Sequence, residues 1–245
     1  MDIQDIYTTS NYIANKHKSG NAFTPNQFNA LVHLLNRDYF KKKVEESGYF
    51  DSSALSFSDS LRGSKDLHTF IVNEVIASGG SASYTFAYPL GASDNDTDVL
   101  VEFVSEAEYH DRLGDSVMTP SASAPIALER GGNIDVEPNS TANLNLSYYR
   151  FPSTPFLDYY ISVTGIIQFL GAGITHTWTT AEIDSSGTVH TTGDADWSSL
   201  TVELEYNEDM HQDFLSEILS RVGIRLKELE LTKYAETMKA EQKSM

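Results

Sequence analysis

The spacing of apolar residues changes from a helical to a strand-like period near Ser81 and changes back near Asn207. Before Ser81, apolar residues recur every three or four positions, which places them on one face of an α-helix. Between the two points apolar and polar residues alternate, as in Leu144, Leu146 and Tyr148, which is typical of a half-buried strand. This order predicts an α+β fold, with terminal helices packed into a helical body and an inserted antiparallel β region.

We expect this pattern to divide the chain into three parts. Residues 1–80 form an N-terminal helical part, residues 81–206 an acidic β-rich insertion, and residues 207–245 the C-terminal helices that complete the helical body. The apolar stripes of the terminal helices are wider than a single helix pair would bury, which favours one shared helical body. Within the insertion, the capping box formed by Ser105 and Glu108 predicts one short helix.

The N-terminal part is predicted to hold three helices. The first begins near Ile3. The second has the clearest signals, because Thr24 suits the N-cap, Pro25 suits the first helical position, and Gln27 completes a capping box. The third is expected over residues 66–77, where apolar residues again recur at helical spacing.

The central part is predicted to be built from hairpins. Gly131 and Gly132 separate two apolar runs, which indicates a tight turn between two strands. By contrast, residues 171–199 are rich in Gly, Thr, Ser and Asp, so we expect a long exposed loop or a mobile hairpin there. Because Trp178 and Trp197 lie in this segment, we interpret it as an exposed arm that becomes ordered on contact with a neighbouring protein.

Charge is distributed unevenly along the chain. Residues 81–220 contain 22 acidic residues and only three basic ones, Arg112, Arg130 and Arg150, while the whole chain has a net charge of −18. An acidic surface repels phosphate, so the central part is not expected to bind nucleic acid specifically. DNA would instead pass such a surface without adhering to it.

We expect no cofactor and no metal site. The chain has no cysteine, which excludes disulfides, thiolate nucleophiles and cysteine-ligated metals. Residues 94–98 resemble the start of a calcium loop, but Val99 and Ser105 stand where that loop needs glycine and glutamate. The seven histidines form no H-x-x-x-H pair. No apolar run approaches the roughly 20 residues that span a bilayer, and the N-terminus lacks the apolar segment of a signal peptide.

The sequence also contains no convincing catalytic motif, and we do not expect an enzyme. Residues 79–83 resemble the nucleophile elbow of serine hydrolases only superficially, because no helix is predicted after them. The acidic pairs Glu106 with Glu108 and Glu203 with Glu205 leave a hydrolase as a distant alternative, since two carboxylates can serve as general acid and base.

The aromatic residues of the central part allow another interpretation, a carbohydrate-binding β-rich module with a sugar-stacking face. The residues concerned are Tyr148, Tyr149, Tyr159, Tyr160, Trp178 and Trp197. We favour a different account, in which the alternating tyrosines fill the core of a sheet and the exposed tryptophans contact another protein.

Five groups of residues carry a further similarity. They are PNQFNAL with NRDYF within 25–40, YPL at 88–90, VSEAEYHDRL at 104–113, YYRFPSTP at 148–155, and LEYNE with KYAE within 204–236. Together they resemble structural proteins at the head-to-tail junction of short-tailed bacteriophages, particularly of the crAss-like phages that infect Bacteroidetes. The similarity extends over nearly the whole chain, and residues 171–199 depart from it most.

This resemblance implies a virion structural protein that forms a neck ring, or adaptor, between the portal and the tail around the DNA channel. It implies a homo-oligomer, expected to be a dodecamer that matches a twelve-fold portal, with the portal protein and other neck or tail proteins as partners. Another structural protein of the tail is the alternative within the same class. The protein would be assembled in the host cytoplasm and remain in the virion, with no membrane partner and no specific binding to the passing DNA.

The C-terminal helix is the segment expected to bind a partner. After the acidic stretch the charge turns basic, with Arg225 and Lys227 early in this helix and with Leu231, Tyr234 and Met238 as its apolar residues. A basic and partly apolar helix is steered towards an acidic surface and buries area there. The resemblance implies that this partner is the portal or an adjacent ring.

Overall fold

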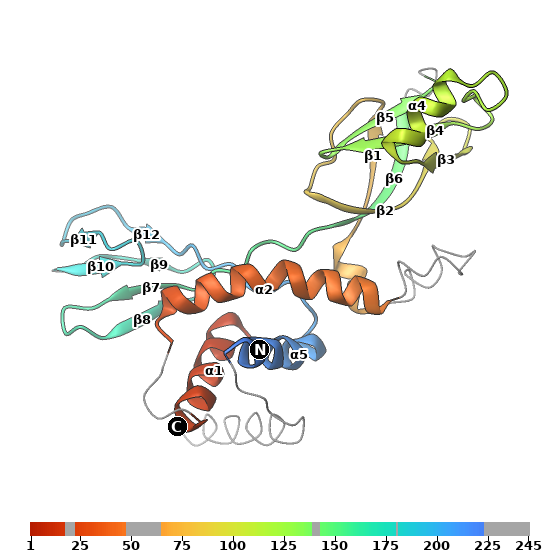
Figure 1. Cartoon of the computed structure of the whole chain (residues 1–245). Coiled ribbons are helices and arrows are strands. Elements are labelled where there is room, and N and C mark those ends of the chain that lie inside the picture. The colour runs from red at the N-terminus through yellow and green to blue at the C-terminus, as the bar shows by residue number, and fades with distance from the viewer. Residues whose placement is uncertain (18–22, 48–64, 139–142, 180, 223–245) are drawn as a thin grey trace. The chain divides into compact units, whose positions relative to one another are not determined.

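The computed structural model describes residues 1–17, 23–47, 65–138, 143–179 and 181–222 (Figure 1). These residues form twelve β-strands, four α-helices and one 3-10 helix. The structure is therefore mostly β, and the prediction of a helical body with an inserted β region is wrong. The chain divides into two units, Met1–Lys42 with Pro152–Met245 and Lys43–Phe151, so the boundaries expected at residues 80 and 206 do not coincide with those of the units.

The first unit combines helices and strands that are far apart in the sequence. It contains α1 (Ile3–His17), most of α2 (Pro25–Glu46), α5 (Glu208–Arg221) and six of the twelve strands. The helices therefore do not form a separate body. They pack beside strands that the apolar spacing assigned to an insertion, because residues 152–206 belong to the same unit as both helical ends.

Two helices of this unit begin and pack as predicted. The backbone N–H of Thr24 donates to Gln27 Oε1 at 3.0 Å, and the backbone N–H of Gln27 donates to Thr24 Oγ1 at 3.3 Å, which confirms the capping box. On α5, Phe214 and Ile218 are fully buried, as the apolar stripe predicts. The ring of Tyr39 on α2 meets the Phe214 ring edge-on with centroids 5.2 Å apart, so aromatic contacts join the two helices.

The six strands of the first unit form what we call the β lobe, residues 156–202. Its four-stranded antiparallel sheet has the order β11-β10-β7-β8. The strands are β7 (Asp158–Ile161), β8 (Ile167–Leu170), β9 (Thr175–His176), β10 (Glu182–Asp184), β11 (Val189–His190) and β12 (Trp197–Ser198). β9 pairs with β12, and reciprocal hydrogen bonds of 3.0 and 2.8 Å between Phe156 and Val202 close the base of the lobe. The long loop expected over residues 171–199 is therefore wrong, because four short strands fall within it.

The second unit is built around a six-stranded sheet of order β1-β6-β2-β3-β4-β5. Its elements are η1 (Lys65–Phe70), β1 (Ile71–Ala77), β2 (Phe86–Asp94), β3 (Leu100–Phe103), α4 (Glu106–Gly114), β4 (Ile126–Arg130), β5 (Asn133–Glu137) and β6 (Asn143–Arg150). All neighbouring strands are antiparallel except β3 and β4. Leu144, Leu146 and Tyr148 of β6, which lies between β1 and β2, are buried, and this confirms the alternation in the sequence.

The third predicted helix, over residues 66–77, is wrong. A 3-10 helix occupies Lys65–Phe70, and Ile71–Ala77 is the strand β1. All seven residues of β1 pair with β6, from Ile71 opposite Tyr149 to Ala77 opposite Asn143. The β-branched residues of this segment suit a strand, and a partner strand that is distant in the sequence supplies the hydrogen bonds that decide the outcome.

Two local predictions in the second unit, a hairpin turn and a helix N-cap, are confirmed. Gly131 and Gly132 connect β4 to β5 with φ angles of +62° and +91°, the backbone conformation that a tight hairpin turn of this kind needs. Ser105 caps α4, since its Oγ accepts a hydrogen bond of 3.3 Å from the backbone N–H of Glu108.

Candidate functional site

Three carboxylates are buried in the β lobe without a lysine or arginine nearby in the sequence. Asp158, Glu182 and Asp184 have exposed fractions of 0, 5 and 4 %. Between Arg150 and Arg221 the chain has no lysine or arginine at all. Because a buried carboxylate without partners is costly, hydrogen bonds and histidines must stabilise these three groups.

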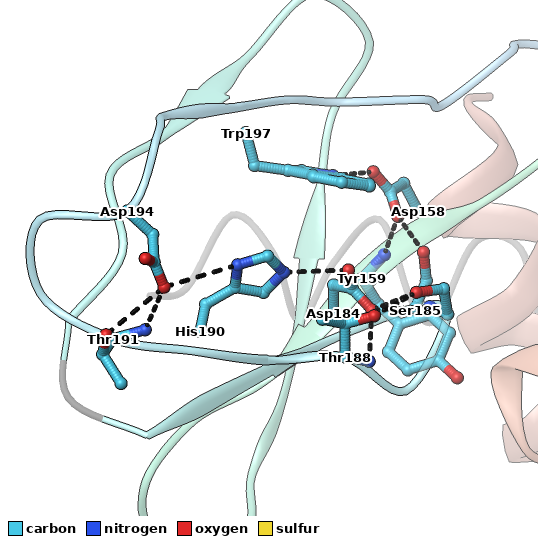
Figure 2. Close-up of polar contacts among 10 residues, drawn as sticks. Asp158, Tyr159, Asp184, Ser185, Thr188, His190, Thr191, Asp194 and Trp197 are labelled. Carbon is cyan, nitrogen blue, oxygen red and sulfur yellow. Dashed lines mark hydrogen bonds and ion pairs between the residues drawn. The ribbon is translucent and has the colours of Figure 1, made fainter.

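Asp158, at the start of β7, is stabilised entirely by uncharged donors (Figure 2). Its Oδ1 accepts hydrogen bonds from the backbone N–H of Tyr159 at 2.9 Å and from Ser185 Oγ at 2.6 Å. Its Oδ2 accepts from Trp197 Nε1 at 2.8 Å and from the backbone N–H of Leu200 at 2.9 Å. This one carboxylate therefore connects β7 to the chain before β11 and to the chain around β12.

Asp184 ends β10 and holds the turn that follows it. Its Oδ1 accepts from the backbone N–H groups of Ser186 and Thr188, at 2.9 and 2.8 Å, and from Ser186 Oγ at 2.6 Å. Its Oδ2 lies 2.9 Å from Nε2 of His190 on β11. Burial raises the pKa of Asp184, but the hydrogen bonds from Ser186, His190 and Thr188 outweigh it and lower the pKa.

Glu182 makes the second carboxylate–histidine pair. Its Oε2 accepts a hydrogen bond of 2.8 Å from the backbone N–H of Thr179 and lies 3.0 Å from His176 Nε2. Burial raises the pKa of Glu182, while the hydrogen bonds from Thr179 and His176 lower it, with a net lowering. Glu182 and Asp184 are two residues apart on β10, so one short strand carries the carboxylates of both pairs, while the histidines lie on β9 and β11.

The side chain of Trp178 lies between the two histidines. The His190 ring stacks on it with centroids 4.0 Å apart and an interplanar angle of 6°, and the His176 ring meets it edge-on at 4.9 Å. The Tyr160 ring stacks on the His176 ring, with the two centroids 4.0 Å apart. The lobe thus has a core in which aromatic rings and buried carboxylates lie beside a few aliphatic side chains such as Leu157 and Leu170.

This arrangement corrects the prediction of an exposed arm. Trp178 is 2 % exposed and forms the centre of the lobe, while Trp197 is half-buried and bonded to Asp158. A signal was available in the sequence, because His176 and Trp178, and then Glu182 and Asp184, stand two residues apart as on one face of a strand. This spacing does not predict a buried strand by the usual pattern, because that pattern requires aliphatic residues at the buried positions.

The partner-binding residues predicted in the C-terminal helix lie outside the described residues. They are Arg225, Lys227, Leu231, Tyr234 and Met238.

The chemistry of the β lobe is that of a structural network. Ser185 Oγ donates to Asp158 and Ser186 Oγ donates to Asp184, so these hydroxyl groups stabilise anions and are not activated by an imidazole base. Throughout the described ranges, no three or more His, Asp or Glu side chains are grouped in a way that could hold a metal ion.

The acidic pairs considered for catalysis are also engaged in the structure. Glu203 Oε2 accepts a hydrogen bond of 2.8 Å from the backbone N–H of Ile3, and Glu205 Oε2 accepts one of 2.8 Å from the backbone N–H of Ser153. They tie the chain before α5 to two different segments, so these two carboxylates do not face a common substrate position.

All three arginines of the acidic stretch make contacts within the second unit. Arg112 bonds Glu102 and Glu108 at 2.6 and 2.5 Å, and these hydrogen bonds raise the pKa of its guanidinium group. Arg130 lies 3.2 Å from Glu106 and 3.5 Å from Asp135. The guanidinium of Arg150 lies 5.6 Å from the centre of the Phe70 ring and 5.4 Å from that of Tyr84, as in a cation–π contact.

Comparison with models of known protein families and with curated proteins found no match to this chain. Of the helices that the structure describes, none combines the length and the apolar character needed to cross a lipid bilayer.

Proposed function

We propose that this protein is a non-enzymatic structural protein of a short-tailed phage virion, where it forms a neck ring between the portal and the tail around the DNA channel. The resemblance of the sequence suggests this function, and one structural observation supports it. The three arginines of the acidic stretch are all held in contacts within their own unit, while acidic side chains such as Asp96, Asp98 and Asp111 are exposed. These exposed carboxylates add negative charge to the surface of the second unit.

Such a surface suits the wall of a DNA channel. Carboxylates repel the phosphates of DNA, and at physiological ionic strength the repulsion decays over about 8 Å. It therefore acts only on DNA that comes close to the wall. The wall resists adhesion without opposing the passage of the duplex through the centre.

The proposed assembly is a dodecamer that binds the portal and other neck or tail proteins. Its basic C-terminal residues, Arg225 and Lys227, are proposed to meet an acidic surface of the portal or an adjacent ring, and Leu231, Tyr234 and Met238 to bury apolar area there. The protein would be assembled in the host cytoplasm and retained in the virion.

Nothing in the described part of the chain favours the carbohydrate-binding alternative. Tyr148 and Tyr149 are fully buried and belong to the second unit, whereas Trp178 is buried in the first. A sugar-stacking platform needs exposed aromatic faces, and these three rings are already covered by protein.

Reconstitution with the portal tests the proposal. The full-length protein is mixed with the portal protein of the same phage, and the products are examined by negative-stain electron microscopy and native mass spectrometry. We expect twelve-fold rings stacked on the portal, and no retention of a double-stranded DNA fragment at physiological salt. A protein that stays monomeric and does not bind the portal would contradict the proposal.

A further inference from the structure

The hairpin of β7 and β8 ends in what we call the aliphatic tip, Val163, Ile166 and Ile167. Their exposed fractions are 62, 57 and 39 %. The turn between the two strands points away from the helices of the same unit (Figure 1). The tip is thus separate from the helical packing and from the buried carboxylates of the lobe.

The turn that carries the tip has a defined hydrogen-bonded structure. The backbone N–H of Ser162 donates to the carbonyl oxygen of Ile166 at 2.9 Å, and that of Gly165 donates to the carbonyl oxygen of Ser162 at 2.8 Å. Ser162 Oγ lies 2.9 Å from Thr164 Oγ1. The polar groups of the turn therefore bond one another, while its aliphatic side chains face solvent.

This distribution is unusual for a turn. Hairpin turns are normally formed by Gly, Asn, Asp and Ser, which are compatible with water. Three neighbouring aliphatic side chains instead leave apolar area exposed. A contact that removes this area from water lowers the free energy. The tip therefore has the properties of a contact surface.

The segment that carries the tip contains no charged residue, and this favours a second copy of the chain as its partner. Residues 159–181 contain no Asp, Glu, Lys or Arg, although the whole chain carries a net charge of −18. A basic or acidic partner would find no opposite charge here. Two copies of a strongly acidic protein repel each other over most of their surface, and an uncharged aliphatic segment is where they approach at the lowest electrostatic cost.

We propose that the aliphatic tip is the surface through which one copy of this protein binds a second copy. This inference rests on the proposed function, because a ring requires a contact between neighbouring subunits. It adds to that function the location of the contact and its uncharged, aliphatic character.

The test compares three variants of the full-length chain by sedimentation velocity over a range of concentrations. Ile166→Asp places a charge in the tip, and Ile166→Ser removes apolar area without adding charge. Val189→Asp is the control, since Val189 lies on β11 of the same lobe and has an exposed fraction of 60 %, close to the 57 % of Ile166. We expect self-association to weaken about ten- to hundredfold in Ile166→Ser, and more in Ile166→Asp, with little change in the control.

Several outcomes would overturn the inference. One is a wild-type protein that stays monomeric at every concentration, and another is self-association that both Ile166 variants retain. Wild-type binding to phosphatidylcholine vesicles that Ile166→Asp abolishes, without any self-association, would assign the tip to a lipid surface. Rings on the portal formed by the Ile166 variants would refute this contact and leave the neck ring intact. Tip-dependent self-association without portal binding would support the contact and refute the neck ring.

Discussion

At the scale of single residues, the β lobe depends on carboxylates that pair with no lysine or arginine among the residues that the structure describes. Asp158 accepts four hydrogen bonds from uncharged donors, and Glu182 and Asp184 each pair with a histidine. Hydrogen bonds to an ionised carboxylate are stronger than those between neutral groups. Together these three residues connect all the strands of the four-stranded sheet except β8, and they also connect the chain around β12.

Asp158→Asn should destabilise the β lobe by about 1–3 kcal/mol. An amide has one oxygen, so its NH₂ group must face donors in either orientation: the backbone N–H of Tyr159 in one, and Trp197 Nε1 with the backbone N–H of Leu200 in the other. Urea unfolding followed by tryptophan fluorescence measures the effect, since both tryptophans of the chain lie in the lobe. Asp196→Asn, which removes the same charge from an exposed position, should change stability by less than about 0.5 kcal/mol. Equal stability of the two variants would refute the role given to Asp158.

The stability of the lobe should fall as the pH falls through the range where Glu182 and Asp184 become protonated. The folded lobe lowers both pKa values below their ordinary values of 4.5 and 3.8, so the unfolded chain binds protons more readily. Stability therefore rises with pH in this range, is fully present above about pH 4.5, and is lost on acidification.

Fluorescence-detected melting between pH 6 and 3 checks this dependence. Glu182→Gln should melt at a lower temperature than the wild type at pH 6, and the difference should shrink as the pH falls. Asp196→Asn, which removes an exposed carboxylate, is the control and should melt close to the wild type at pH 6. A constant difference between Glu182→Gln and the wild type over the whole range would contradict the pKa shift of Glu182.

At the scale of elements, the helices with local signals could be predicted and several strands could not. The capping boxes at Thr24 and Ser105 specify helix starts within four residues. The structure contains the full box at Thr24 and the N-cap hydrogen bond at Ser105. Residues 71–77 fit a helical and a strand pattern equally well, and only their pairing with β6 decides between them. That pairing is a contact between distant segments, which local spacing does not encode.

The strands of residues 171–199 escaped prediction for a different reason. They are two or three residues long, and their buried positions include Trp178, Glu182 and Asp184 in place of an aliphatic alternation. Polar residues in a sequence usually indicate solvent exposure, whereas in this segment they form a hydrogen-bonded core. The sequence therefore singled out Trp178 and Trp197 as candidate functional residues. It did not predict that the rest of the lobe buries Trp178 and partly covers Trp197.

Phe214→Ala on α5 should destabilise the first unit by about 3–5 kcal/mol. Phe214 is fully buried and its ring contacts those of Tyr39 and Tyr206, so truncation leaves a cavity between α5 and α2. Gln212→Ala, an exposed position on the same helix, serves as the control and should change stability by less than about 0.5 kcal/mol. Chemical denaturation followed by circular dichroism measures both variants, and similar midpoints would show that the stripe of α5 is not a packed core.

At the scale of the whole molecule, the acidic centre and the basic C-terminal residues suggest a division of roles. In the proposed function, the acidic surface keeps DNA from adhering and the basic residues bind a partner. Truncation after Val222 should abolish association with the portal at moderate salt, because it removes Arg225, Lys227 and the apolar residues that follow.

The matched controls separate charge from apolar area. Charge reversal by Arg225→Glu with Lys227→Glu should weaken portal binding and reduce its dependence on salt. Lys243→Glu, close to the end of the chain, should have a much smaller effect. Normal co-assembly of the truncated protein with the portal, measured by co-sedimentation, would remove the C-terminal residues from the interface.

The most direct measurement of the central claim is cryo-electron microscopy of intact virions of the phage that we propose encodes this chain, at a resolution that identifies side chains. We predict a ring between portal and tail into which the two units of this protein fit separately, with the acidic surface around Asp96, Asp98 and Asp111 facing the DNA channel. A neck whose density matches other sequences, with this chain elsewhere in the virion or absent from it, would contradict the account.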